Sequence, residues 1–167
     1  MTLPPSVVYR KVIQTGRYAE KLGAQILGLG AFTSVVGDGG ITIAQNLNIP
    51  VTTGDSYTVT MAVDALREAA TVMDIDITQA TTAVVGATGA VGKTCAQMLS
   101  RESGRLLLVG RRLDALEEVR DQCEGSAQMV ATTEISTIYE ADLILTVTSA
   151  LHAVIEPRHL KPGAVVC

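Results

Sequence analysis

The stretch 84–94, VVGATGAVGKT, contains the residues whose types and spacing carry the clearest chemistry in this sequence. Starting at Gly86, the glycines follow the spacing G-x-x-G-x-x-G, a variant of the turn that holds a dinucleotide pyrophosphate at a helix N-terminus. Starting at Ala87, the same stretch ends in G-K-T and matches a relaxed Walker A loop with Ala in place of the first glycine. One interpretation predicts a redox enzyme and the other a nucleotide hydrolase.

The surroundings of this stretch favour the dinucleotide interpretation. A Walker A lysine works with a magnesium-binding residue, usually an Asp at the end of a later strand. The later segments 105–110 and 142–149 end in VGRR and LTVTSA, which supply no carboxylate. Lys93 falls in the first turn of a helix whose apolar face needs Val91 and Cys95, so we interpret it as a solvated side chain. A P-loop hydrolase remains the disfavoured alternative.

Two arginines after the second strand indicate which dinucleotide is bound. In a dinucleotide-binding fold, the residue about 20 positions after the glycines contacts the adenosine ribose, and an Asp or Glu there binds the 2′-hydroxyl. Here Arg111 and Arg112 occupy that place. Their planar cationic side chains suit a 2′-phosphate, so we predict NADP, although two arginines can also simply make a turn soluble.

A second cofactor contact is expected from the end of the fourth strand. Ligands of such sheets bind beyond the carboxyl ends of the strands, which places Thr148 and Ser149 near the nicotinamide half. That these two residues only cap a loop is an equally open alternative. The complete set of predicted cofactor-binding residues is Gly86, Ala87, Thr88, Gly89, Ala90, Val91, Arg111, Arg112, Thr148 and Ser149.

The elements that must position these residues alternate along the chain from about residue 80. Segment 113–123 repeats its apolar residues every three or four positions, as one face of a helix does. Strands that alternate with helices predict β-α-β units and a parallel sheet. We therefore expect an α/β fold, a Rossmann-type doubly wound parallel sheet preceded by part of an α/β substrate lobe. The predicted strands are 81–86, 105–110, 127–131, 142–149 and 164–167; the predicted helices are 90–102, 113–123 and 134–141, with a helical turn at 156–163.

The first 75 residues follow a different pattern. We expect helices at 5–23 and 56–73, a strand at 24–32 that runs into the Gly-rich loop TSVVGDGG, and a short strand and turn at 49–58. A domain boundary near residue 75 then separates a partial substrate-side lobe, 1–75, from an NADP-binding Rossmann domain, 76–167, whose C-terminal part we expect to be truncated. The predicted buried stripe of helix 56–73 consists of Val59, Ala62, Val63, Leu66, Ala69, Ala70 and Met73.

Composition narrows the class of protein. The 167 residues are 47% hydrophobic but only 3% aromatic, which favours an aliphatic core of the kind that parallel sheets bury. The net charge of −4 argues against a nucleic-acid surface. Three widely spaced cysteines form no disulfide framework, and the sequence shows neither a leader pattern nor a run of 18 apolar residues. We expect a cytoplasmic protein without a membrane span; a homo-oligomer is compatible with these features.

Three motifs together carry a resemblance to a known family. GAFTSVVGDGG, VTTGDSYT and IDITQATTAVVGATGAVG resemble, in the same order, motifs of the long-chain acyl-acyl-carrier-protein reductases, which form fatty aldehydes with NADPH. The chain is also similar to the broader group that includes shikimate dehydrogenase and glutamyl-tRNA reductase. The resemblance implies an acyl carrier protein or coenzyme A thioester as substrate. It also implies that the substrate contacts Phe32, Thr33, Ser34, Thr53, Gly54, Asp55 and Tyr57.

The same resemblance implies a cysteine nucleophile that holds the acyl group as a thioester. It would lie in the C-terminal part of the family, beyond residue 167, so the catalytic residues stay unknown. We interpret Cys95, Cys123 and Cys167 as structural. His152 and His159 lie seven residues apart without a partner in metal-ligand spacing, so we predict no metal site.

Two further functions stay open beside acyl-thioester reduction. One is a dehydrogenase of the shikimate or amino-acid type, which acts on a small polar substrate and needs a Lys/Asp pair, for which TGDSYT offers only Asp55. The other is a non-catalytic NADP-binding module.

Overall fold

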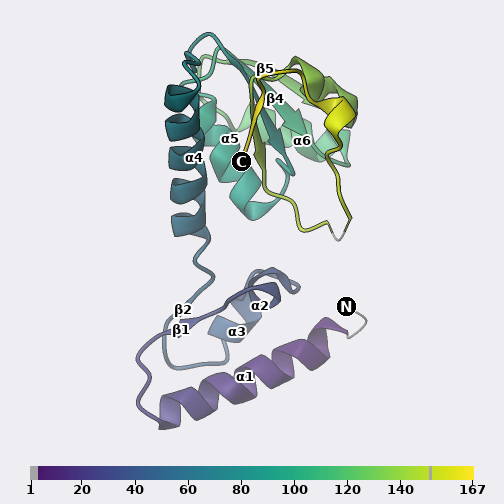
Figure 1. The fold of residues 1–167 in the computed structure, drawn as a ribbon. Coiled ribbons are helices and arrows are strands. Elements are labelled where there is room, and N and C mark those ends of the chain that lie inside the picture. The colour runs from purple at the N-terminus through teal and green to yellow at the C-terminus, as the bar shows by residue number, and fades with distance from the viewer. Residues whose placement is uncertain (1–3, 151) are drawn as a thin grey trace. The chain divides into compact units, whose positions relative to one another are not determined.

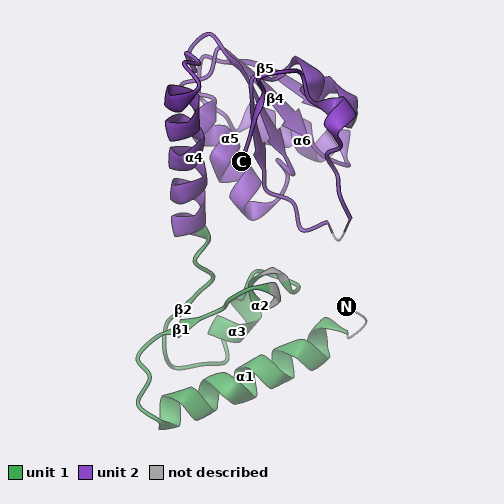
Figure 2. Cartoon of the chain, viewed as in Figure 1, with its two compact units in different colours: residues 1–55 green, residues 56–167 purple. Residues whose placement is uncertain are grey.

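The protein consists of two compact units, Met1–Asp55 and Ser56–Cys167 (Figure 2). The structure, a computed structural model, describes residues 4–150 and 152–167. Within those residues no helix is both long enough and apolar enough to cross a membrane.

The second unit is built on a five-stranded sheet in which all neighbouring strands are parallel, in the order β5-β4-β3-β6-β7 (Figure 1). The chain builds outward from β3 to β5 and then returns to place β6 on the other side of β3. This arrangement confirms the predicted Rossmann-type α/β fold. The strands are β3 (Thr81–Val85), β4 (Arg105–Val109), β5 (Gln128–Thr132), β6 (Leu143–Thr146) and β7 (Val165–Val166).

Each face of this sheet has its own apolar core, because successive side chains of a strand point to opposite faces. Val84, Leu108 and Leu145 lie in one cluster with the buried sides of three helices, α4 (Asp55–Val72), α5 (Ala90–Leu99) and α6 (Leu113–Asp121). Ala83, Leu107 and Ile144 lie in the other. The second face is covered by short segments, the 3-10 turn η1 (Ile135–Glu140) and apolar residues on either side of the 3-10 turn η2 (Pro157–His159). The segment predicted as a helix at 134–141 is thus a 3-10 turn.

Helix α4 belongs with the sheet. Its buried residues Val59, Val63, Leu66 and Ala70 are part of the same cluster as the strands. The two units therefore divide after Asp55, about one helix earlier than the predicted boundary near residue 75. Met73, predicted to lie in the buried stripe, is half exposed because it follows the last turn of the helix.

The first unit consists of α1 (Pro5–Lys21), β1 (Leu27–Gly28), α2 (Phe32–Val35), α3 (Ile41–Ala44) and β2 (Val51–Thr52). The strands predicted within 24–32 and 49–58 are present but contain only two residues each, and they pair in parallel. The predicted loop after 32 begins with the one-turn helix α2, and α3 was not predicted. Helix α1 lies close to the rest of the unit at Gly16, where an added Cβ would be 2.5 Å from Leu47 Cδ1.

The packing of α4 leads to a stability prediction. Replacing the fully buried Leu66 by Ala removes apolar contacts from the sheet core, so we expect the free energy of unfolding to fall by about 2–5 kcal/mol. The matched control on the same helix is Met61→Ala, at a half-exposed position, where we expect a change within about 0.5 kcal/mol. Urea denaturation followed by circular dichroism measures both. Equal effects of the two changes would contradict the assignment of α4 to the sheet core.

Candidate functional site

The candidate site lies where the strand order of the sheet reverses. β3 pairs with β4 on one side and with β6 on the other, and Val85 is in register with Thr146 at the carboxyl ends. The connections that follow β3 and β6 lead to opposite faces of the sheet, so a crevice opens between these two ends. In open parallel sheets this is the place where ligands bind.

A pocket of about 370 Å³ occupies this place. It brings together Gly86, Thr88, Gly89, Arg111, Thr148 and Ser149, six of the ten residues predicted to bind the cofactor. The predicted residues Ala87, Ala90, Val91 and Arg112 are not among its lining. The lining also includes residues that the sequence interpretation missed: Val85, Val109, Gly110, Thr133, Ile135, Val147, Ala150 and Val154. Thr133 follows the end of β5, so the strand-end rule that selected Thr148 could also have found it.

The turn after β3 fits the site only because Gly86 has no side chain. Its φ is +92°, a left-handed conformation that L-residues rarely adopt, and an added Cβ would lie 2.6 Å from the carbonyl oxygen of Val147. Gly92 is equally constrained, because a Cβ there would lie 2.2 Å from the carbonyl oxygen of Gly86. Gly89 is not constrained in this way, since its nearest neighbour would be 3.4 Å away. Gly86 and Gly92 are thus required by the shape of the turn, whereas the position of Gly89 has room for a side chain.

Helix α5 begins beside the pocket with an uncapped N-terminus, since its N-cap residue Gly89 lines the pocket. Gly89 is its N-cap and supplies no side-chain hydrogen bond, and the first bond of the helix runs from Lys93 N–H to Gly89 C=O at 2.9 Å. Helix geometry leaves the N–H groups of the first turn without intrahelical acceptors, and they carry partial positive charge. The N–H of Ala87 differs, because it donates to Val109 C=O at 3.2 Å and the residue is fully buried.

The two arginines after β4 have different surroundings. Arg111 lines the pocket and, among the described residues, has no carboxylate within ion-pair distance. Arg112 is the N-cap residue of α6, and its guanidinium lies 3.7 Å from the carboxylate of Asp114 in the first turn of that helix. Only Arg111 therefore offers an uncompensated positive charge to a ligand in the pocket.

The segment after β6 supplies two of the hydroxyl-bearing residues that line the pocket. Thr148 and Ser149 are exposed, and Thr148 Oγ1 accepts a hydrogen bond from Ala150 N–H at 3.2 Å, which leaves its own proton available to a ligand. This bond shows that Thr148 shapes the loop, the alternative considered from the sequence, while its contact with a cofactor stays a prediction. Thr146, the last residue of β6, has a buried Oγ1 without a hydrogen-bond partner among the described residues.

The three cysteines lack the environment of an activated nucleophile. Burial raises the pKa of the Cys95 thiol to about 11, and Cys95 is fully buried. Burial also raises the pKa of Cys123, whose Sγ lies 3.2 Å from Val119 C=O in hydrogen-bond geometry, and that of the exposed Cys167. Because the thiolate is the reactive form, all three pKa shifts reduce reactivity at neutral pH, in agreement with the structural interpretation.

The two histidines are not brought together into a site. His159 is buried, and its Nδ1 accepts a hydrogen bond from Glu156 N–H at 3.1 Å, which closes the 3-10 turn η2. His152 is exposed. Across residues 4–150 and 152–167, no group of three or more His, Cys, Asp or Glu side chains is arranged to hold a metal ion.

Most residues expected to face the substrate lie in the first unit. The hydroxyls of Thr33 and Ser34 donate to Gly30 C=O and Ala31 C=O, both at 2.7 Å, and so stabilise the turn that starts α2. The side chain of Phe32 lies outside what the structure describes. Thr53 Oγ1 accepts from Asp55 N–H at 3.4 Å where α4 begins. Gly54 has a φ of +76°, and Tyr57, in the second unit, is strongly exposed.

The Gly-rich loop and the 53–55 turn are neighbours within the first unit, since a Cβ on Gly40 would lie 3.7 Å from Thr53 Cγ2. Asp38 fastens this loop through Oδ2, which accepts from Thr42 N–H at 3.0 Å and from the Thr42 hydroxyl at 2.5 Å. The hydrogen bond from the Thr42 hydroxyl is the main reason why the pKa of Asp38 is lowered. Oδ1 of Asp38 is buried without a partner in the described part of the chain.

Comparison with known proteins relates this geometry to a family. Residues 67–165 match the shikimate/quinate 5-dehydrogenase family. The long-chain acyl-[acyl-carrier-protein] reductase of Synechococcus elongatus is 32% identical over 94% of this chain and 48% of its own length. Aminotransferase PigE of a Serratia species is 28% identical over 86% of this chain and 17% of its own length. The chain therefore spans half or less of each of these relatives.

Solved structures support the fold. A dipicolinate synthase chain from Bacillus halodurans superimposes with a TM-score of 0.54 at 14% identity, over 84% of this chain and 49% of that chain. At this level of identity the likeness concerns the fold alone.

The glycine turn gives a prediction that separates its two kinds of glycine. In Gly86→Ala, an alanine must adopt a left-handed φ, and its Cβ would overlap the Val147 backbone. We therefore expect the free energy of unfolding to fall by about 2–4 kcal/mol. Gly89→Ala, at a φ of −74° with room for a Cβ, should change it by less than about 1 kcal/mol. Thermal or urea unfolding measures both, and the reverse ranking would contradict the described turn.

The thiol environment gives a second prediction. At pH 8 a group with a pKa of about 11 is about 0.1% ionised, so iodoacetamide should leave Cys95 unmodified in the folded protein while it labels the exposed Cys167. Labelling of Cys95 should appear in urea or as the pH rises toward 11. Peptide mass spectrometry reports each site, and rapid modification of Cys95 in the native protein at pH 8 would show that this thiol is activated.

Proposed function

This chain belongs to the shikimate/quinate 5-dehydrogenase family, and from that premise we propose that it is the dinucleotide-binding part of an NADPH-dependent oxidoreductase that reduces acyl thioesters to aldehydes. The observation that carries the cofactor assignment is Arg111, an unpaired cation in the pocket at the carboxyl end of β4. A cation at this place favours a ribose 2′-phosphate, whereas NAD would call for a carboxylate that binds the 2′-hydroxyl.

The rest of the pocket fits a dinucleotide. The cradle between Gly86 and α5 is one that a Cβ at either Gly86 or Gly92 would fill. The uncapped N–H groups of α5 attract the pyrophosphate, as helix N-termini do for anions. Arg111 then binds the adenosine end, and the hydroxyls of Thr148 and Ser149 orient the nicotinamide end. The bound cofactor supplies a hydride, and in thioester reduction the carbon–sulfur bond breaks as the aldehyde forms.

The thioester substrate rests on the extent of the similarity. The family match begins at residue 67, but the similarity to the acyl-[acyl-carrier-protein] reductase covers 94% of the chain and so includes the first unit. The first unit contains the Gly-rich loop and the 53–55 turn, whose residues we propose to contact an acyl group delivered by acyl carrier protein or by coenzyme A. Cys95 is fully buried and burial raises the pKa of all three thiols, so we propose that the nucleophile of this reaction is none of these three cysteines.

A second candidate is a dehydrogenase for a small polar substrate, which the family match itself favours. The two candidates share the cofactor site and differ only in the substrate. Oxidation of NADPH by the protein with a long-chain acyl thioester supports the first, and reduction of NADP⁺ with a hydroxyl-bearing ring acid or an amino acid supports the second.

The cofactor proposal predicts different effects of the two arginines. Arg111→Ala removes a charge-assisted contact to the 2′-phosphate, so the Kd for NADPH should rise about 10- to 100-fold while the Kd for NADH stays the same. Arg112→Ala, a matched change at the neighbouring residue that pairs with Asp114, should change the NADPH Kd by less than about threefold. Fluorescence titration of NADPH and NADH measures all of these constants.

Two outcomes would count against the proposal. Equal affinities for NADPH and NADH in the native protein would remove the assigned role of Arg111. Magnesium-dependent ATP binding by the native protein that is lost in Lys93→Ala would favour the P-loop interpretation.

A further inference from the structure

The cations of helix α1 differ from most cations of the second unit. Among the described residues, Arg10, Lys11, Arg17 and Lys21 have no carboxylate within 4.0 Å, the ion-pair limit. In the second unit most cations do have such a partner. Those paired cations are Arg67, Arg101, Arg105, Arg112, Arg120, Arg158 and Lys161. The positive charges of α1 are therefore not neutralised by an ion pair within the described part of the chain.

Three of these four cations share one line along the helix. At 3.6 residues per turn, Arg10, Arg17 and Lys21 lie within about 40° of one another around the helix axis, and Lys11 lies about 100° away from Arg10. All three are exposed. We call Arg10, Arg17 and Lys21 the basic stripe.

The acidic residue of α1 does not neutralise the stripe through an ion pair. The Glu20 carboxylate accepts hydrogen bonds from Asn48 N–H at 2.5 Å and from Ile49 N–H at 3.2 Å, so it is used to hold the segment before β2. The stripe thus keeps its charge although the whole chain carries a net charge of −4.

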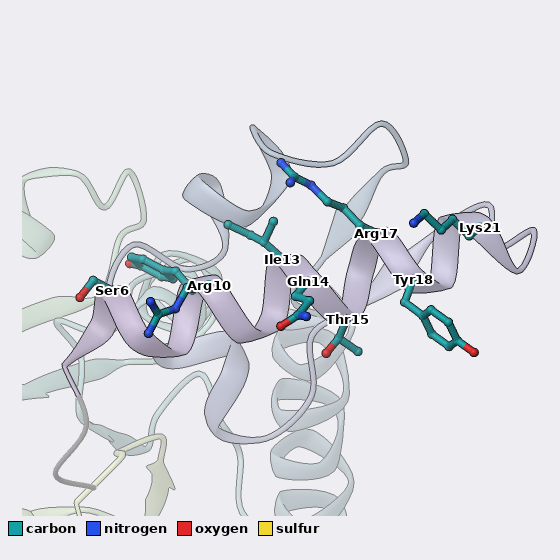
Figure 3. A pocket seen from close by; sticks show the side chains of 9 residues that line it. Ser6, Arg10, Ile13, Gln14, Thr15, Arg17, Tyr18 and Lys21 are labelled. Atoms are coloured by element: carbon teal, nitrogen blue, oxygen red, sulfur yellow. The ribbon is translucent and has the colours of Figure 1, made fainter.

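The stripe lies on an exposed stretch of α1 with neighbouring side chains of the same helix, and Figure 3 shows the labelled side chains projecting from α1. Ile13 lies beside the stripe, and the strongly exposed Tyr18 lies to one side of it. Tyr9 faces the rest of the unit instead, since its hydroxyl accepts a hydrogen bond from Asp38 N–H at 2.9 Å. Arginine and tyrosine together with an apolar residue are the composition of protein-binding surfaces. The other neighbouring side chains are Ser6, Gln14 and Thr15.

We propose that this face of α1 docks an acidic protein that presents a row of carboxylates along a helix. The stripe extends over about 16 Å, at 1.5 Å per residue, which matches several carboxylates on successive helical turns. A single phosphate needs cations that converge on one point, and these are spread along a line. Nucleic acid is disfavoured by the net negative charge of the chain.

The identity of the partner rests on the proposed function, in which an acyl group arrives on a carrier protein. The occupant is then the acyl carrier protein itself, bound by its acidic surface. Coenzyme A carries the same thioester chemistry without such a surface, and it should not need the stripe.

Binding of purified acyl carrier protein, measured by fluorescence anisotropy in the absence of NADPH, tests this inference. The triple variant R10E/R17E/K21E should raise the Kd at least 30-fold, and the neutral triple variant R10Q/R17Q/K21Q about 10-fold, because both remove the complementary charge. The matched control Lys11→Glu, on the same helix but off the stripe, should change the Kd less than threefold. Raising NaCl from 50 to 300 mM should weaken the native complex about tenfold and the charge-reversed variant hardly at all.

The outcomes that overturn the inference are specific. Equal loss of binding in Lys11→Glu and in the triple variants would show a general charge effect without a docking surface. Unchanged binding in the folded R10Q/R17Q/K21Q protein, or a stripe that instead binds anionic vesicles or RNA more tightly than carrier protein, would also overturn it. NADPH affinity, measured in the same variants, should stay unchanged, so failure of docking is distinguishable from failure of the cofactor proposal.

Discussion

The candidate site depends on the close approach of two backbone segments at the carboxyl ends of β3 and β6. Gly86 lies so near the Val147 carbonyl that a Cβ would be 2.6 Å from its oxygen, and its φ of +92° directs the chain sharply away from the strand. Gly92 then lets α5 begin directly against the same turn. Any larger residue at these two positions would move the helix N-terminus, and with it the N–H groups of its first turn. The position of the helix N-terminus at the site thus follows from two missing side chains.

The distribution of charge builds on this framework. In the second unit most cations are paired with carboxylates, which leaves Arg111 as an uncompensated charge in the pocket. In the first unit the cations of α1 are left unpaired on one exposed face. We propose that ligands neutralise the charge at these two places, a phosphate in the pocket and an acidic partner on the helix.

The sequence predicted the sheet well and the first unit poorly, for physical reasons. β3 and β4 are buried on both faces, so they appear as short continuous apolar runs between turn residues. β1 and β2 have two residues each and carry no periodic signal. The stripe of α4 showed that the helix is amphipathic but could not show which unit it packs against. Arg111 and Arg112 are neighbours in the sequence, so the sequence could not show that Arg111 lines the pocket while Arg112 pairs with Asp114.

The central claim is that a dinucleotide binds where the strand order reverses, and amide chemical shifts of the ¹⁵N-labelled protein during NADPH titration test it most directly. We expect saturable shifts at Gly86, Thr88, Gly89, Thr148 and Ser149, with the amides of α1 unchanged. Shifts confined to α1, or no shifts at cofactor concentrations in the millimolar range, would contradict the account.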